Sequence, residues 1–288
     1  MRITEDGLIL LDDVKVGENS YSFLLDTGAT QSAIFENTFE RTGLNVHTNT
    51  NKTVYGMVKT EKRQTVEISK FAVGPLEFAQ QELIVLPNRD VNFKTTGKYD
   101  GLIGMDVLSP YQVYVSPRTS EFKLIPNHKM VTVPATWDRV ELLDNPFEGG
   151  QWALHFIDVR VAGQIRPALV DTGAEFSAMN WNSAQYQQIK FLKRRLRKEW
   201  ELQGAVGNFS PIARVVLEEF RSGQKFWRSK EFVVMDFDGL EALGVSDAPL
   251  LIAGMNLFED ETFLIDFDRN YIAIKPREDN VQSFASHK

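Results

Sequence analysis

Two short segments of the chain carry residue types suited to acid–base chemistry. The first is Leu24-Leu25-Asp26-Thr27-Gly28-Ala29-Thr30, and the second is Leu169-Val170-Asp171-Thr172-Gly173-Ala174-Glu175. In each, an apolar pair runs into an aspartate, a threonine and a glycine, which is typical of a buried strand that ends at a carboxylate. Two carboxylates held side by side share one proton, because ionising both is costly. The charged carboxylate then acts as a general base on water, and the protonated one donates its proton.

The similarity between the two segments extends along the chain. Matching sequences precede and follow them at a constant offset of about 145 residues, and a later glycine-methionine element repeats at about 150, which indicates an internal duplication. The matched pairs are 13–16 with 158–161, 32–34 with 177–179, and 102–107 with 252–257. A lone Asp-Thr-Gly is a weak signal, since the same tripeptide also suits a simple turn after a strand. Its repetition in a repeated context favours a functional pair.

The elements that must position the two aspartates are strands. Residues 20–25 alternate apolar side chains, and residues 165–170 form a similar run, so both predict strands that lead into the aspartates. Residues 32–42 predict a strand and a short helix that stops at Gly43. Residues 53–58 and 64–73 predict two strands around a turn at 59–62.

The strongest helical pattern lies in the second half of the chain. Residues 182–202 place Ile189, Leu192, Leu196 and Trp200 on one face, and Asn182 or Ser183 is suited to cap the helix. Lysines and arginines cover the rest of this segment, which we interpret as a solvated surface because the whole chain is acidic.

Composition limits the classes of function. The 288 residues include 43% hydrophobic and 25% charged residues, as in a globular protein large enough for two domains. The net charge of −7 does not favour a nucleic-acid partner, and no apolar run approaches the length of a membrane span. There is no cysteine, and the histidines show no ligand-like spacing, so we predict no metal and no cofactor.

The repeated motifs resemble those of pepsin- and retropepsin-type aspartic proteases, and are most similar to bacterial retropepsin-like domains duplicated within one chain. The resemblance implies a mostly β fold of two lobes related by a pseudo-two-fold axis, with a few short helices and one longer helix in the second lobe. It also implies an aspartic endopeptidase that acts on peptide or protein substrates, with Asp26 and Asp171 as the catalytic dyad. Both aspartates come from one chain, so we expect a monomer.

The resemblance also implies roles for the neighbours of the aspartates. Thr27 and Thr172 match threonines that interlock the two loops, and Gly28 and Gly173 match glycines whose N–H groups bind the carboxylates. Ala29, Thr30, Ala174 and Glu175 are candidate substrate contacts, and the glutamate departs from the short polar residue usual there. Hairpins called flaps cover the substrate in this family, and the matching positions are Tyr55 and Gly56 in the first copy and Gly204 in the second.

The sequence predicts a first lobe over 1–127, a linker over 128–150, a second lobe over 151–277 and a polar tail over 278–288. The first residues lack the features of a signal peptide, which favours a cytoplasmic protein, or a periplasmic or secreted one if a leader was removed. Two other functions remain open. One is a peptide- or protein-binding module that keeps the fold without catalysis, and the other is a structural protein in which the duplicated domain serves dimerisation.

Overall fold

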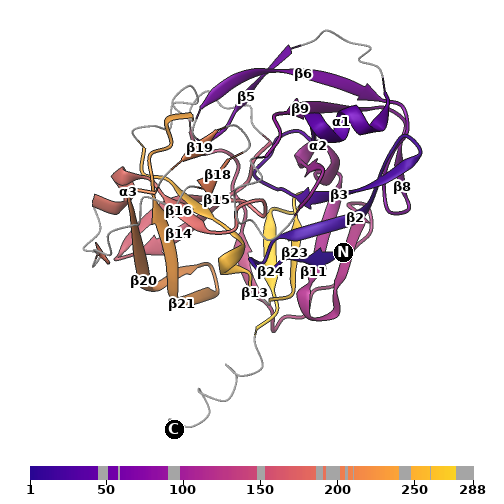
Figure 1. Ribbon diagram of the computed structural model, residues 1–288. Coiled ribbons are helices and arrows are strands. Elements are labelled where there is room, and N and C mark those ends of the chain that lie inside the picture. Colours follow the sequence, from indigo (N-terminus) through magenta and orange to yellow (C-terminus); the bar gives the residue numbers. More distant parts are fainter. Residues whose placement is uncertain are drawn as a thin grey trace.

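The chain folds into two β-rich lobes that repeat one arrangement of strands, as the computed structural model shows (Figure 1). This is the mostly β, two-lobe architecture that the sequence predicted. The structure describes residues 1–44, 51–57, 59–89, 98–147, 153–185, 191–192, 202–204, 207–209, 211–239, 248–259 and 261–276. The predicted tail at 278–288 lies outside these ranges.

Lobe 1 is built on the sheet formed by β1–β10. Its strands lie in the order β5-β6-β9-β4-β10-β3-β2-β7-β8, with β1 paired to β2. Their bounds are β1 (Arg2–Ile3), β2 (Ile9–Val16), β3 (Asn19–Leu25), β4 (Ala33–Phe35), β5 (Asn51–Tyr55), β6 (Thr60–Ile68), β7 (Phe71–Val73), β8 (Leu76–Phe78), β9 (Gln81–Leu86) and β10 (Gly101–Ile103).

Lobe 2 is built on the sheet of β14–β17 and β20–β22, in the order β14-β15-β22-β16-β21-β20-β17. The bounds are β14 (Phe156–Val161), β15 (Gln164–Val170), β16 (Ser177–Met179), β17 (Phe191–Leu192), β20 (Ala213–Ser222), β21 (Lys225–Val234) and β22 (Leu251–Ala253). A separate hairpin joins β18 (Leu202–Gln203) to β19 (Asn208–Phe209).

The same strand arrangement lies behind each aspartate. In lobe 1, β10 runs parallel to β3 and antiparallel to β4. In lobe 2, β22 runs parallel to β15 and antiparallel to β16. The ends of β3 and β15 are buried on both faces, with Phe23, Leu24 and Leu25 all inside the core. Two-sided burial of this kind fits the continuous apolar runs before the aspartates.

A third sheet joins the two halves of the chain. Its order is β12-β11-β23-β24-β13, and its bounds are β11 (Tyr111–Ser116), β12 (Glu121–Pro126), β13 (Asp138–Glu141), β23 (Phe263–Asp266) and β24 (Tyr271–Ile274). The central pairing, β11 with β23, brings Val113 opposite Ile265, and both are fully buried. The predicted linker therefore contributes a strand of its own, β13, to a sheet shared by both halves.

The helices are short in the described ranges. They are α1 (Glu36–Thr42), α2 (Met105–Leu108) and α3 (Trp181–Gln185), with 3-10 turns η1 (Pro117–Thr119) and η3 (Met255–Leu257). The predicted strand and helix before Gly43 are confirmed, and this glycine ends α1 with a φ of 67°, which suits a residue without a Cβ. None of these helices is long and apolar enough to cross a membrane.

The prediction of one helix over 182–202 is wrong. Helix α3 starts at Trp181, and its N-terminal cap is Asn180, whose Oδ1 accepts the N–H of Ser183 at 2.9 Å. Further along, Phe191 and Leu192 form strand β17 against β20. Pairing with an available sheet edge outweighed the helical periodicity, because tertiary contacts routinely override local propensity. The basic residues at 193–198 lie outside the described ranges.

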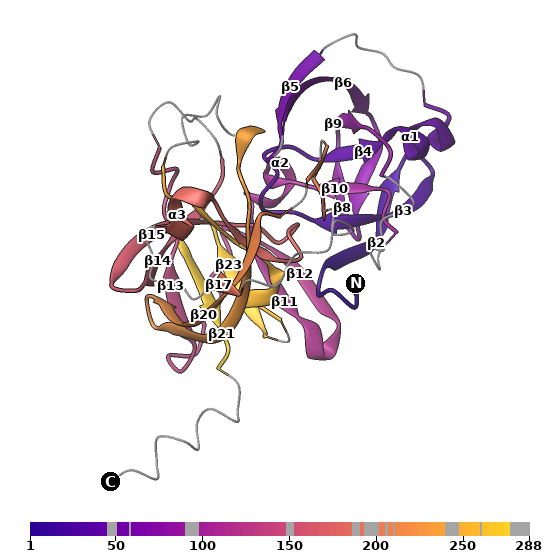
Figure 2. The same ribbon diagram turned by 60° about the vertical axis from the view of Figure 1, so that its left-hand side comes forward.

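The hairpin of β5 and β6 also differs from its prediction. Tyr55 pairs with Thr60, so the turn begins at Gly56 and residues 60–62 belong to β6. The hairpin reaches from lobe 1 toward lobe 2 at the upper side of the molecule in both ribbon views (Figures 1 and 2).

Candidate active site

The two aspartates follow directly on the ends of β3 and β15. The Asp26 N–H donates to the carbonyl of Ile103 at 3.0 Å, and the Asp171 N–H donates to the carbonyl of Ala253 at 3.1 Å. These bonds continue the parallel pairings of β3 with β10 and of β15 with β22. The sheets therefore fix both aspartates at equivalent points of the two lobes.

Glycines hold each carboxylate and leave room for the opposite one. Gly28 donates its N–H to Asp26 Oδ1 at 3.0 Å, while Gly173 and Ala174 donate to Asp171 Oδ1 at 2.9 and 3.0 Å. A Cβ on Gly28 would lie 2.5 Å from Asp171 Cγ, and a Cβ on Gly173 would lie 2.5 Å from Asp26 Cγ. Each glycine of one loop thus abuts the carboxyl group of the other, and the two carboxyl groups are hydrogen-bonded neighbours.

The threonines lock the two loops together. The Thr27 hydroxyl donates to the carbonyl of Val170 at 2.8 Å and accepts the N–H of Thr172 at 3.1 Å. In return, the Thr172 hydroxyl donates to the carbonyl of Leu25 at 2.8 Å and accepts the N–H of Thr27 at 3.0 Å. Both threonines are buried. Four hydrogen bonds across the lobe boundary therefore keep the aspartates in one fixed relation.

A serine and an aspartate support the loop of lobe 1 from behind. Ser32 donates its N–H and its hydroxyl to Asp106 Oδ1 at 2.8 and 2.7 Å, and its Oγ accepts the N–H of Gly104 at 3.0 Å. The N–H of Met105 donates to the carbonyl of Ala29 at 2.9 Å. Burial raises the pKa of Asp106, and the Ser32 bonds act against this rise.

Lobe 2 repeats this support with an asparagine in place of the aspartate. Ser177 donates its N–H and its hydroxyl to Asn256 Oδ1 at 2.8 and 2.6 Å, and its Oγ accepts the N–H of Gly254 at 3.0 Å. The N–H of Met255 donates to the carbonyl of Ala174 at 2.8 Å. The sequence showed this repeat but assigned no role to the serines, and the structure shows that they brace the aspartate loops.

The protonation of the Asp26–Asp171 pair follows from its surroundings. Asp26 and Asp171 are partly buried, and their carboxyl groups lie where the two loops meet. Burial, and then the charge of Asp171, raise the pKa of Asp26 well above its usual range. Burial also raises the pKa of Asp171, to about 6, while bonds from Gly173 and Ala174 limit the rise. The site therefore favours a pair that holds one proton at mildly acidic pH.

A tyrosine from lobe 1 lies close to Asp26 and Asp171. Burial, with a contribution from the carboxyl groups of Asp26, Asp171 and Glu175, raises the pKa of Tyr99 to about 12. The ring is held by Arg89, whose Cζ lies 4.5 Å from the ring centroid. Sequence reasoning missed Tyr99, because the matching position in the second copy is Pro249 and the repeat gives no signal there.

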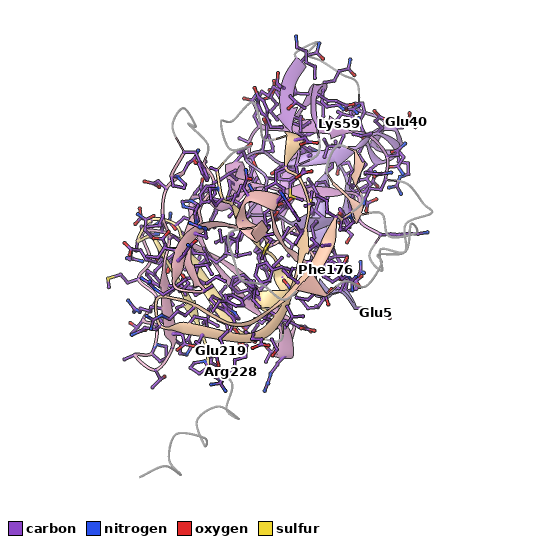
Figure 3. The ribbon with its side chains drawn as sticks, turned by 90° about the vertical axis from the view of Figure 1, so that its left-hand side faces the viewer. Glu5, Glu40, Lys59, Phe176, Glu219 and Arg228 are labelled. Atoms are coloured by element: carbon purple, nitrogen blue, oxygen red, sulfur yellow. The ribbon has the colours of Figure 1, made fainter. Side chains whose placement is uncertain are left out.

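Glu175 lies next to Asp6, in the N-terminal turn of the chain. Burial, followed by the charge and hydrogen bond of Asp6, raises the pKa of Glu175 to about 7. Figure 3 labels Phe176, which follows Glu175 in the chain, and Glu5, which precedes Asp6. Thr30, the counterpart of Glu175, is half-buried. The two loops therefore differ in charge at this one position, as their sequences implied.

The predicted flap residues lie in two hairpins. Tyr55 ends β5, and the buried Gly56 begins the turn, where its N–H donates to the carbonyl of Lys59 at 3.0 Å. Gly204 lies in the turn of the β18–β19 hairpin and donates its N–H to the carbonyl of Gly207 at 2.9 Å. Their contact with substrate stays a prediction.

The fold and the site define a class. Two β lobes with interlocked Asp-Thr-Gly loops form the architecture of a duplicated, retropepsin-like acid protease. The aspartyl protease family model matches residues 13–107 and 157–256, so the chain belongs to this family and contains its domain twice. No curated protein shows a significant match to the chain. Among the described residues, no group of histidines and carboxylates is arranged to hold a metal ion.

Proposed function

We propose that the protein is an aspartic endopeptidase that hydrolyses peptide bonds with a water activated between Asp26 and Asp171. The observation that carries this proposal is the mutual packing of the two loops, in which each glycine touches the opposite carboxyl group. Nothing in a purely structural role requires two buried carboxyl groups side by side, because they destabilise each other when ionised.

The chemistry uses the shared proton. The charged carboxylate takes a proton from water, and the resulting oxygen attacks the peptide carbonyl carbon. The protonated carboxyl donates to the carbonyl oxygen, which gives a neutral tetrahedral diol. The carboxyl that took the water proton then donates it to the peptide nitrogen, while the other carboxylate accepts a proton from a diol hydroxyl. The C–N bond breaks to give an amine and a carboxylic acid, and the pair again holds one proton. The two carboxyl groups titrate as a pair, and the charged member of the pair acts first as the base.

The chain supplies both aspartates, so a monomer suffices for activity. The Thr27–Thr172 interlock joins two parts of the same polypeptide, whereas single-domain relatives need two chains for one dyad. We expect specific activity to be independent of protein concentration, as tested by dilution over about a hundredfold range. Extended, partly apolar peptide segments are the expected substrates, by analogy with the family.

The deciding experiment is cleavage of an unstructured protein at several pH values between about 3 and 7, a range that brackets carboxyl titration. Wild type is compared with Asp26→Asn and Asp171→Asn, and mass spectrometry identifies the products. The exposed Asp158 supplies a matched control, Asp158→Asn. We expect cleavage by wild type and the control alone. Activity in either dyad variant would refute the shared dyad, and peptide binding without any cleavage would support a binding module instead.

A further inference from the structure

The main sheet of lobe 2 carries a row of four paired residues on its outer face. Pairing of β14 with β20 closes this sheet on itself, so one face lies inside the lobe and the other outside. Arg160 of β14 pairs with Ile165 of β15 on one side and with Arg221 of β20 on the other. Arg221 in turn pairs with Phe226 of β21. We call Ile165, Arg160, Arg221 and Phe226 the arginine row.

The arginine row is open to solvent along its whole length. All four of its residues are exposed, whereas Val161, Phe220 and Trp227, their neighbours along the strands, are buried inside the lobe. Ile165 and Phe226 are 48% and 44% exposed, so each leaves a large part of its apolar surface in water. Single exposed apolar residues are common on proteins, but these two flank the same pair of arginines.

The two arginines at the centre of the row lie opposite each other without an acidic partner. Like charges directly opposite on paired strands destabilise a sheet. Among the residues that the structure describes, neither Arg160 nor Arg221 forms an ion pair. Arg160 has one hydrogen bond, from its Nη1 to the carbonyl of Gly163 at 3.3 Å. The row therefore holds together two positive charges that no described carboxylate neutralises.

The nearest acidic residues on this face flank the row. Glu219 lies two residues before Arg221, and it pairs with Arg228 at 3.8 Å instead. Figure 3 shows Glu219 and Arg228 together at the lower side of the molecule. Asp158 lies two residues before Arg160, on the other side of the row because β14 and β20 are antiparallel. The positive charge is thus confined to the row itself.

Lobe 1 shows that the fold does not need this row. Its equivalent strands, β3, β2, β7 and β8, are paired in the same way. The residues at the same register are Ser20, Lys15, Ala72 and Glu77, which include one cation, one anion and no large apolar side chain. Since both lobes share this backbone arrangement, folding alone does not explain two opposed arginines between apolar residues. Departures of this kind are expected at functional sites.

The length of the row suits a short extended peptide. Paired strands lie about 4.8 Å apart, so the three steps from Ile165 to Phe226 cover about 14 Å. An extended chain rises about 3.3 Å per residue, so its first and fifth side chains lie on one face about 13 Å apart. The third side chain then lies over the middle of the row, where a carboxylate is able to bind both guanidinium groups.

We propose that the arginine row is a docking site for an extended acidic segment of a partner protein, with apolar residues at its first and fifth positions and a glutamate or aspartate at its third. The carboxylate lies between Arg160 and Arg221, and the apolar side chains pack on Ile165 and Phe226. A nucleic acid or an anionic membrane fits less well, because its negative charge continues beyond the row, over the flanking acidic residues.

The docking site is separate from the candidate active site. Ile165 lies near the start of β15, whereas Asp171 follows the end of this strand. Six residues of extended chain separate the two positions, which corresponds to about 20 Å. The docking proposal therefore does not depend on peptidase activity.

The test uses a fluorescent peptide with the core Leu-Ser-Glu-Ser-Leu between Gly-Ser linkers, and two further peptides with Gln or Lys at the central position. The full-length chain carries Asp26→Asn, so that no peptide is consumed whether or not the chain is a protease. Fluorescence anisotropy at low salt gives each Kd. We expect the Glu peptide to bind at least about tenfold more tightly than the Gln peptide, and the Lys peptide to bind more weakly still.

Two variants copy residues of lobe 1 into the row. Arg221→Ala and Ile165→Ser introduce the residues found at positions 72 and 20, which a folded lobe already accepts at the same register. We expect Arg221→Ala to raise the Kd of the Glu peptide at least about tenfold, and Ile165→Ser to raise it about threefold to tenfold. The matched control is Lys15→Ala, which removes one positive charge from the equivalent row and should leave Kd unchanged. Circular dichroism checks folding, and each row variant is decisive without the other.

The outcomes decide both the site and the kind of partner. A Glu peptide that does not bind at about 1 mM, or that binds Arg221→Ala as tightly as the parent chain, would overturn the docking site. The series is repeated with vesicles containing about one third phosphatidylserine and with a single-stranded oligonucleotide. Binding of either that depends on Arg221 as strongly as peptide binding does would overturn the protein partner. Glu-peptide binding that is lost in Arg221→Ala and kept in Lys15→Ala, without binding of vesicles or oligonucleotide, would support the proposal.

Discussion

Replacing Thr27 by valine tests whether the threonine interlock holds the two lobes together. Valine matches threonine in shape but has no hydroxyl. The substitution therefore removes the bond to the Val170 carbonyl at 2.8 Å and the bond from the Thr172 N–H at 3.1 Å. Both partners are backbone groups, and they stay buried at the boundary between the lobes.

The expected magnitude follows from those two orphaned groups. A buried donor or acceptor left without a partner costs about 1–3 kcal/mol, so Thr27→Val should lower the free energy of unfolding by about 2–6 kcal/mol. Thr27→Ser keeps the hydroxyl and loses one methyl group, which costs about 1 kcal/mol. The valine variant should therefore be several kcal/mol less stable than the serine variant, although valine is the more apolar residue.

Urea unfolding at pH 6, followed by fluorescence and circular dichroism, measures both differences. The double variant Thr27→Val/Thr172→Val removes all four bonds and shows whether the two threonines act as a unit, in which case its cost is less than the sum of the single costs. A valine variant as stable as the serine variant would refute the reasoning, because the interlock would then contribute nothing that shape alone does not supply.

Three further predictions concern the same loops. Gly173→Ala places a Cβ 2.5 Å from Asp26 Cγ, so we expect a loss of peptidase activity of at least about a hundredfold, measured as kcat/KM, because misplacement near the chemistry is costly. Folding raises the pKa of Asp171 to about 6, so the stability linked to its proton is present at pH 4 and is lost as pH rises through 6. Asp171→Asn should thus be more stable than wild type at pH 8, by on the order of 2 kcal/mol, with little difference at pH 4 in urea unfolding. Asp106→Asn copies Asn256 of the twin site and should cost less than about 1 kcal/mol in thermal unfolding, whereas Asp106→Leu should cost about 2–4 kcal/mol through unpaired Ser32 groups.

The sequence by itself determined the duplication and the principal residues of the candidate site. The two Asp-Thr-Gly-Ala segments stand in equivalent surroundings, and apolar runs before them specify buried strands. The resemblance implied that the N–H groups of Gly28 and Gly173 bind the carboxylates, and both hydrogen bonds are present. Only the structure shows that a Cβ at either position would meet the opposite carboxyl group. Local pattern and repetition suffice for such features, since the chain carries the same information twice, once in each copy.

Elements without a twin were harder to predict. The periodicity at 182–202 predicted a helix, but Phe191 and Leu192 pair with β20, a partner more than twenty residues away along the chain. The turn of the first hairpin was predicted at 59–62, but residues 60–62 belong to β6, because the register of a hairpin depends on pairing along both strands.

Only the tertiary structure decided which groups meet across the lobes. The bond from Gly239 to Met57 joins residues far apart in the chain, as does the pairing of Asp6 with Glu175. Neither follows from propensity, periodicity or repetition, because their partners belong to different lobes and occur once. The sequence thus specifies which residues each half of the site contains. The packing of the lobes determines how the threonines join the two loops and how far the pKa values of the two aspartates rise.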